Sequence, residues 1–181
     1  VSVEDGVATV TFDRPENKNA MSPGLLKEFG DALEELRNEV RVLVVTGAGD
    51  AFNSGMDLEE YFEEARAAGP HAVREANRIH KRALTTLYDF PHPTIAKLHG
   101  WQAGGRHLLT PLSDITVPAP AVYCCRSGVT DRTAPGGGRL RSVVHSPGQE
   151  HRLHHSRTGD PYARPRPHQI GPRHHAVPPE D

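Results

Sequence analysis

The sequence predicts an α/β fold over residues 1–117, and three observations carry that prediction. Short β-type runs alternate with longer amphipathic helices, joined by short connections. One run, Val42–Thr46, is nearly all apolar, which is typical of a strand inside a sheet that is covered on both faces. Two strand-like runs end in glycine turns ahead of a helix. The 181 residues suffice for one domain, or for most of a larger one.

The N-terminal elements follow from local patterns. Residues 1–12, VSVEDGVATVTF, alternate as two short strands about a turn at Glu4-Asp5-Gly6, and a loop follows. Ser22 is placed to cap a helix that has Pro23 at its first position. The apolar residues of this helix recur on one face: Leu25, Leu26, Phe29, Leu33, Leu36 and Val40.

The later elements repeat the alternation. After the strand at 42–46 comes the turn GAGDAFNSGMDLEEYF, residues 47–62, with a short helix starting near Asp57. A second long helix at 71–90 is ended by prolines. The remaining expected elements are a strand at 94–98, a helix headed by Gly104-Gly105, and a strand beginning at 113–117.

Residues 118–181 have a different composition from the segment 1–117. They carry 10 of the 16 prolines, 7 of the 12 histidines and 9 arginines, but no lysine. Proline interrupts this segment too often for long helices or strands, so we expect it to be largely irregular. The predicted organisation is therefore a core at 1–117 and a poorly matching tail at 118–181.

Charge and cysteine content exclude several classes of partner. A net charge of −2 gives no reason to expect nucleic acid or an anionic membrane, and no apolar run could span a bilayer. The adjacent Cys124 and Cys125 do not predict a disulfide framework, and the His pairs at 154–155 and 174–175 lack acidic partners for a metal. No signal peptide is visible, so a cytoplasmic protein is expected.

The two glycine turns share a chemical property. The first N–H groups of a helix have no partner within it, and glycine lets the backbone approach a ligand closely. Two such donors that converge on one point would form an oxyanion hole. The alternative is that both are ordinary strand-to-helix turns, which every α/β protein contains.

Four motifs, in order, resemble the enoyl-CoA hydratase (crotonase) superfamily. They are DRPENKNAM at 13–21, LVVTGAGDAFNSGMDL at 43–58, PTIAKLHGWQAGG at 93–105 and SDI at 113–115. The resemblance implies a crotonase-type superhelix of ββα units, incomplete in this chain. It also implies a homo-oligomer, trimer or hexamer, for the intact family member.

The same resemblance implies how the site works. The backbone N–H groups of Met56 and Gly105 would bind the thioester carbonyl of an acyl-CoA. No separate cofactor is expected, since coenzyme A is part of the substrate. Two preorganised donors suit this chemistry because an enolate places negative charge on the thioester oxygen.

The segments GMDLEEYF and HGWQAGG are most similar to the hydroxycinnamoyl-CoA hydratase-lyases, which convert feruloyl-CoA to vanillin and acetyl-CoA. In that subfamily the residue matching Tyr61 holds the phenolic hydroxyl of the substrate; the alternative is that Tyr61 belongs to the apolar face of a helix. By the same resemblance, further substrate contacts are expected at Lys18, Ala20, Ser54 and Trp101. A solvated Lys18 and a core Trp101 are the alternatives.

The chain departs from the family pattern at several points. Arg106 replaces a third glycine, and Leu108 stands where these enzymes have Ser or Glu. The acid/base Glu should fall at 126–128, where no carboxylate stands; the nearest is Asp131. A one-base shift in a GC-rich gene would turn the Cys-Cys-Arg-Ser segment into a Leu-Ser-Glu-like one, so the tail is either frameshifted or divergent.

The chain also stops before the expected C-terminal helices. These departures leave three functions open: a hydratase-lyase, a generic enoyl-CoA hydratase or isomerase, and a non-catalytic acyl-CoA-binding fragment.

Overall fold

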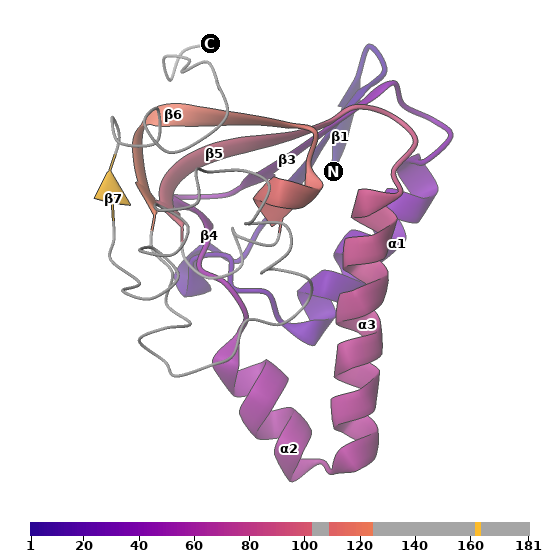
Figure 1. The fold of residues 1–181 in the computed structure, drawn as a ribbon, viewed down its shortest axis with the longest axis vertical. Coiled ribbons are helices and arrows are strands. Elements are labelled where there is room, and N and C mark those ends of the chain that lie inside the picture. The colour runs from indigo at the N-terminus through magenta and orange to yellow at the C-terminus, as the bar shows by residue number, and fades with distance from the viewer. Residues whose placement is uncertain (103–108, 125–161, 164–181) are drawn as a thin grey trace, which may run out of the picture.

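The computed structural model describes residues 1–102, 109–124 and 162–163. One mixed sheet runs through it in the order β1-β2-β3-β5-β6-β7, with β4 paired to β5 (Figure 1). The strands are β1 Ser2–Glu4, β2 Val7–Phe12, β3 Val42–Gly47, β4 Ala51–Asn53, β5 Thr94–Gln102, β6 Ile115–Cys124 and β7 Tyr162–Ala163.

The pairing confirms the predicted N-terminal hairpin and shows that the centre of the sheet is parallel. Strands β1 and β2 are antiparallel, whereas β2, β3, β5 and β6 pair in parallel. Strand β6 runs to Cys124, so regular structure extends beyond the predicted limit at residue 117. This extension has partners on both sides: β5 pairs with β6 in parallel, and β7 pairs with it antiparallel at Tyr123 and Cys124. Proline interrupts local patterns without preventing this tertiary pairing.

The helices predicted before Gly104 are present with small changes in their limits, whereas the start of the one headed by Gly104-Gly105 lies outside the described residues. Helix α1 is Pro23–Leu36, and the Ser22 hydroxyl accepts the Leu25 N–H at 3.1 Å, which confirms the cap. Helix α3 is Pro70–Tyr88. The expected short helix after the first glycine turn is a π-helix, η2 Glu59–Glu64, continued by α2 Ala65–Ala67. Single 3₁₀ turns lie at η1 Pro15–Asn17 and η3 Thr110–Leu112.

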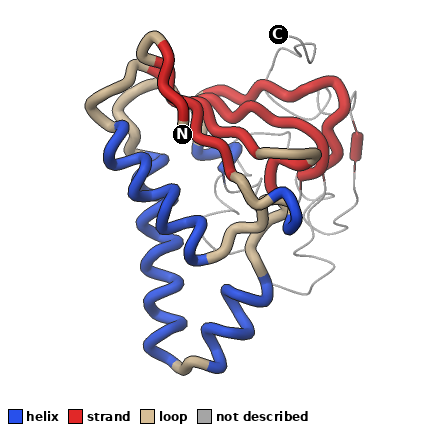
Figure 2. The backbone as a smooth tube through the Cα atoms, turned by 180° about the vertical axis from the view of Figure 1, so that it is seen from behind, coloured by secondary structure: helices blue, strands red, loops and turns tan. Residues whose placement is uncertain are grey.

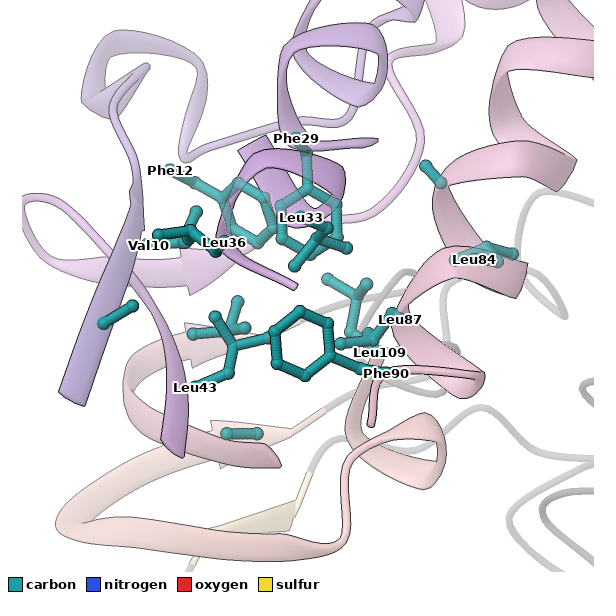
Figure 3. Close-up of a cluster of buried hydrophobic side chains, with 14 of the residues drawn as sticks. Val10, Phe12, Phe29, Leu33, Leu36, Leu43, Leu84, Leu87, Phe90 and Leu109 are labelled. Atoms are coloured by element: carbon teal, nitrogen blue, oxygen red, sulfur yellow. The ribbon is translucent and has the colours of Figure 1, made fainter. Parts of the chain in front are cut away.

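Helices α1 and α3 lie side by side against the sheet (Figures 1 and 2). Their inner faces join the buried side chains of β2 and β3 in one hydrophobic core (Figure 3). Phe12 is fully buried in it, with its ring edge-on to Phe29 at 5.1 Å and to Phe52 at 6.2 Å between centroids. Edge-to-face aromatic contacts of this kind stabilise the core beyond the burial of apolar area.

Strand β3 corrects one expectation. Its apolar run predicts a strand that is covered on both faces, but only alternate residues are buried, among them Leu43 and Val45. Val42, Val44 and Thr46 are half-buried in the described structure, because α1 and α3 pack on the opposite face. Within the described ranges, no helix is long and apolar enough to cross a membrane.

Candidate active site

The loop between β2 and α1 contains two consecutive residues in the left-handed backbone conformation. Lys18 has φ +48° and Asn19 has φ +56°. Few non-glycine residues adopt this conformation, and asparagine does so more readily than most. The resulting turn buries Asn19 completely.

The Asn19 side chain fastens this loop to the chain that follows β3. Its Nδ2 donates to the carbonyl oxygens of Ala48 and Ala51 at 2.9 and 2.7 Å, and its Oδ1 accepts the Arg14 N–H at 2.9 Å. This close approach needs glycine at position 47, because a β-carbon there would overlap the Ala51 carbonyl oxygen. The first glycine turn is thus shaped to receive an amide side chain.

A second buried amide, that of Asn53, continues the connection. Its Nδ2 donates to the main-chain oxygen of Asn19, and its Oδ1 accepts the Gly55 N–H at 2.8 Å. Gly55 has φ +110°, a conformation that side chains other than hydrogen disfavour. We call Asn19, Asn53 and the backbone groups they bind the amide clamp.

The amide clamp ends at Gly55, the residue directly before Met56. A parallel bridge pairs Met21 with Met56: the Met21 N–H donates to Gly55 O at 2.7 Å, and the Asp57 N–H donates to Met21 O at 3.1 Å. The bridge therefore uses Gly55 O and the Asp57 N–H, which flank Met56. The N–H of Met56 itself points to the other side of the segment. Within the described residues, the Met56 N–H donates to no acceptor. A fixed donor of this kind is what an oxyanion hole requires.

Arg14, in the loop after β2, binds the residues that follow Met56. Its guanidinium donates to Asp57 at 3.2 Å, to Glu60 at 2.7 Å and to the Ala20 carbonyl at 3.3 Å. Asp57 in turn accepts the Glu60 N–H at 3.2 Å, at the start of the π-helix. These contacts tie the residues after Met56 to the same loop that the amide clamp holds.

Tyr61 lies in a small apolar cluster that Met56 contacts. It packs with Ala65 and Ala76 and is 8% exposed. Its hydroxyl donates to Asn77 Oδ1 at 2.7 Å and lies 3.3 Å from His80 Nδ1. Burial raises the pKa of the Tyr61 hydroxyl, so the phenol keeps its proton at neutral pH.

The second glycine turn is described only at its start. Gly100 has φ +53°, and a β-carbon there would overlap the Asp50 carbonyl oxygen, so the two turns approach each other closely. The backbone of Trp101 pairs with Ala51 and Tyr123. Gly105, the Trp101 side chain and residues 126–128 lie outside the described residues, and their predicted roles stay predictions.

The other predicted contacts lie in the same loop and turn. Ala20 is buried, and its N–H donates to Asn17 O at 3.0 Å. The Ser54 N–H donates to Lys18 O at 2.9 Å, and its hydroxyl donates to Asn17 O at 3.2 Å. The structure thus brings Lys18, Ala20 and Ser54 together beside Met56, while their contacts with substrate stay predictions. In the described part of the chain, no three His, Cys, Asp or Glu side chains are grouped to hold a metal ion.

Sequence reasoning missed the structural parts played by Arg14 and Asn53. Asn53 had one available signal, a polar residue directly after Ala51 and Phe52 in a segment that is now a buried strand. Nothing in the sequence indicated the ion pairs of Arg14.

A family comparison decides the assignment of the chain. The model for the enoyl-CoA hydratase/isomerase family matches residues 2–127. The chain belongs to this family. Its fold is the mixed α/β arrangement of the crotonase-type proteins, as the sequence predicts.

Individual members of this family show how far the similarity extends. A hydroxycinnamoyl-CoA hydratase-lyase from Pseudomonas fluorescens is 34% identical over 184 aligned residues, covering 98% of this chain and 66% of that protein. A solved enoyl-CoA hydratase from Polaromonas sp. JS666 superposes with a TM-score of 0.83 at 25% identity, covering 92% of this chain and 65% of that one. Another solved structure, AtuE from Pseudomonas aeruginosa, gives a TM-score of 0.86 at 26% identity, covering 98% and 69% of the two chains. The chain thus spans about two thirds of the length of these family members.

Proposed function

We propose that this chain binds a coenzyme A thioester whose carbonyl oxygen accepts the Met56 N–H. The observation that carries the proposal is the Met21–Met56 bridge, which leaves this one N–H directed away from its neighbours. The second donor of the proposed hole is the Gly105 N–H. Negative charge that develops on the thioester oxygen would be stabilised by both donors without reorganisation.

The proposed substrate is a hydroxycinnamoyl-CoA such as feruloyl-CoA. Its support is the similarity to the Pseudomonas fluorescens hydratase-lyase and the contact of Met56 with the Tyr61 cluster. Because the Tyr61 hydroxyl gives its proton to Asn77, its oxygen acts as an acceptor, and His80 Nδ1 already lies 3.3 Å from it. A phenolic hydroxyl on the substrate could donate a hydrogen bond to the same oxygen.

The proposed reaction has two steps. Water adds across the double bond, with hydroxide joining the β-carbon and a proton joining the α-carbon. A base then takes the β-hydroxyl proton, the bond between the α- and β-carbons breaks, and its electron pair moves onto the thioester as an enolate. Protonation of the α-carbon gives acetyl-CoA, while the β-carbon leaves as the aldehyde, vanillin. The same oxyanion hole serves both steps.

The donor role is tested by removing one N–H group. Proline has no backbone N–H, so Met56→Pro should lower kcat with feruloyl-CoA about 10²-fold. Met56→Ala keeps the N–H and is the matched control, with circular dichroism to check that both variants are folded. Equal loss in the two variants would argue against the donor role.

The substrate is tested by presenting feruloyl-CoA and crotonyl-CoA to the same preparation. Tyr61→Phe should reduce turnover of feruloyl-CoA and leave that of crotonyl-CoA unchanged, because crotonyl-CoA has no phenol to donate. A wild-type chain that hydrates only crotonyl-CoA would favour the generic hydratase instead. An equal effect of Tyr61→Phe on both substrates would assign Tyr61 a packing role.

A second candidate is a protein that binds acyl-CoA without turning it over. The absence of a carboxylate at 126–128 in the sequence favours it. The distinguishing experiment places glutamate there, as Arg126→Glu and Ser127→Glu, and repeats the assay. Affinity for feruloyl-CoA without turnover in every variant would support the binding protein.

A further inference from the structure

We propose that Asn53 is the positioning residue for the Met56 N–H. This inference rests on the proposed function, in which that N–H meets the thioester oxygen. The Asn53 side chain is fully buried, and both ends of its amide are used. Its donor is bound to the Asn19 carbonyl and its acceptor to the Gly55 N–H, so it connects the loop after β2 to the residue directly before Met56.

Because the peptide bond is planar, these contacts determine the direction of the Met56 N–H. In a trans peptide, the carbonyl and the next N–H point in opposite directions. Gly55 O is fixed by the Met21 N–H at 2.7 Å, so the Met56 N–H of the same peptide unit must point away from Met21. Asn53 fixes the preceding peptide unit through the Gly55 N–H at 2.8 Å. Together the two contacts hold the units on both sides of the Gly55 α-carbon.

The glycine at position 55 makes these hydrogen bonds necessary. Gly55 takes φ +110°, and glycine has little intrinsic preference among the available backbone conformations. Hydrogen bonds on either side of it therefore decide where the Met56 N–H points. Asparagine suits position 53 because its short side chain offers a donor and an acceptor in one plane. A carboxylate at the same position would keep the acceptor and lose the donor.

The decisive variant is Asn53→Asp, which restores the donor only when it is protonated. Burial raises the pKa of the introduced carboxyl above the usual value of about 4. We measure the ratio of the dissociation constants of free CoA and feruloyl-CoA, and the infrared stretch of a ¹³C-labelled thioester carbonyl. At about pH 8 the preference for the thioester should fall about tenfold, and the carbonyl stretch should rise. Both should return toward wild type as the pH falls and the carboxyl gains its proton.

Two further variants make the result specific. Asn38→Asp, at an exposed position after α1, makes the same chemical change away from the site and should leave both readouts unchanged. Asn53→Ser cannot titrate and should lose the preference at every pH. If Asn53→Asp loses its helical circular dichroism at high pH, the preference of Asn53→Ser for the thioester tests the positioning role instead.

The outcomes separate the inference from the function on which it rests. A wild-type chain that binds CoA and feruloyl-CoA equally well would overturn the proposed function. A wild-type chain that prefers the thioester, with the same preference in both Asn53 variants, would overturn the positioning role alone. Loss of preference in Asn53→Asp that is reversed by acid supports it.

Discussion

Two groups of polar side chains link distant segments of this chain, and they differ in burial. The amide clamp consists of neutral groups, and both of its asparagine side chains are fully buried. Where α1 packs beside α3, Asp31 pairs with Lys27 at 2.8 Å and with Arg82 at 2.7 Å, on side chains that are 37–63% exposed. Water can replace the partners of the exposed ion pairs but not those of the clamp.

The difference teaches where stability and geometry come from in this fold. A buried donor or acceptor that loses its partner keeps its full desolvation cost, so a buried network tolerates few arrangements. Exposed ion pairs are screened and contribute little. The clamp should therefore fix the site, while the ion pairs should be replaceable. Four substitutions test this contrast.

The largest effect is expected from Gly47→Ala. A β-carbon there would overlap the carbonyl oxygens of Ala51 and Phe52 and lie 2.7 Å from Asn19 Nδ2. We expect the free energy of unfolding to fall by about 3 kcal/mol or more, measured by urea denaturation. Gly24→Ala is the control, since its nearest neighbour would be the Ser22 hydroxyl at an ordinary 3.7 Å. Equal stability of the two variants would refute the close-packed turn.

Asn19→Ala comes next. It leaves the carbonyl oxygens of Ala48 and Ala51 without their donor and places alanine at φ +56°. The expected loss of unfolding free energy is about 2–3 kcal/mol. Asn38→Ala should change it by no more than about 0.5 kcal/mol, as exposed sites usually do. A loss at Asn19 as small as the one at Asn38 would mean that the buried amide clamp contributes no more to stability than an exposed polar side chain.

Arg14→Met should have an intermediate effect. It removes contacts to Asp57 and Glu60, on a side chain that is 22% exposed, while keeping the length of the apolar stem. We expect a loss of about 1–2 kcal/mol in unfolding free energy, together with weaker binding of feruloyl-CoA. Arg14→Lys keeps the charge but not the forked geometry, and should recover only part of the loss. Full recovery by lysine would mean that charge alone matters.

The smallest effect is expected from Asp31→Asn. Hydrogen bonds from Lys27 and Arg82 lower the pKa of the Asp31 carboxyl below its usual 3.8. A lowered folded-state pKa stabilises the protein above pH 3.8, and this contribution is lost as the pH falls through the folded-state pKa. Thermal melts of wild type and variant should differ slightly at neutral pH and coincide in acid. A large difference at neutral pH would place the ion pairs on a par with the clamp.

Much of the fold was predictable because its signals are local. Ser22 and Pro23 mark the start of α1, and alternation identifies β1 and β2. Strand β4 has only three residues inside a turn, so pairing with β5 rather than local pattern creates it. The end of β6 at Cys124 likewise depends on neighbouring strands, which no single segment records.

The glycine turn at Met56 was visible in the sequence, but the contacts that hold it were not. The pattern alone fits an ordinary strand-to-helix turn, and the oxyanion role of Met56 came from the resemblance to the crotonase superfamily and stays a prediction. The contacts that orient the turn could not be predicted, since Asn19 and Asn53 bind groups 29 to 34 residues away in sequence. Distances of that kind depend on how β2, β3 and β4 come together.

The position of the amide clamp in the sequence determines which part of the candidate site is synthesised first. Asn19, Asn53 and every group they bind lie between Arg14 and Gly55, whereas the second glycine turn begins at Gly100. During synthesis, the ribosome therefore supplies the whole amide clamp and Met56 before the segment that carries Gly105 has emerged.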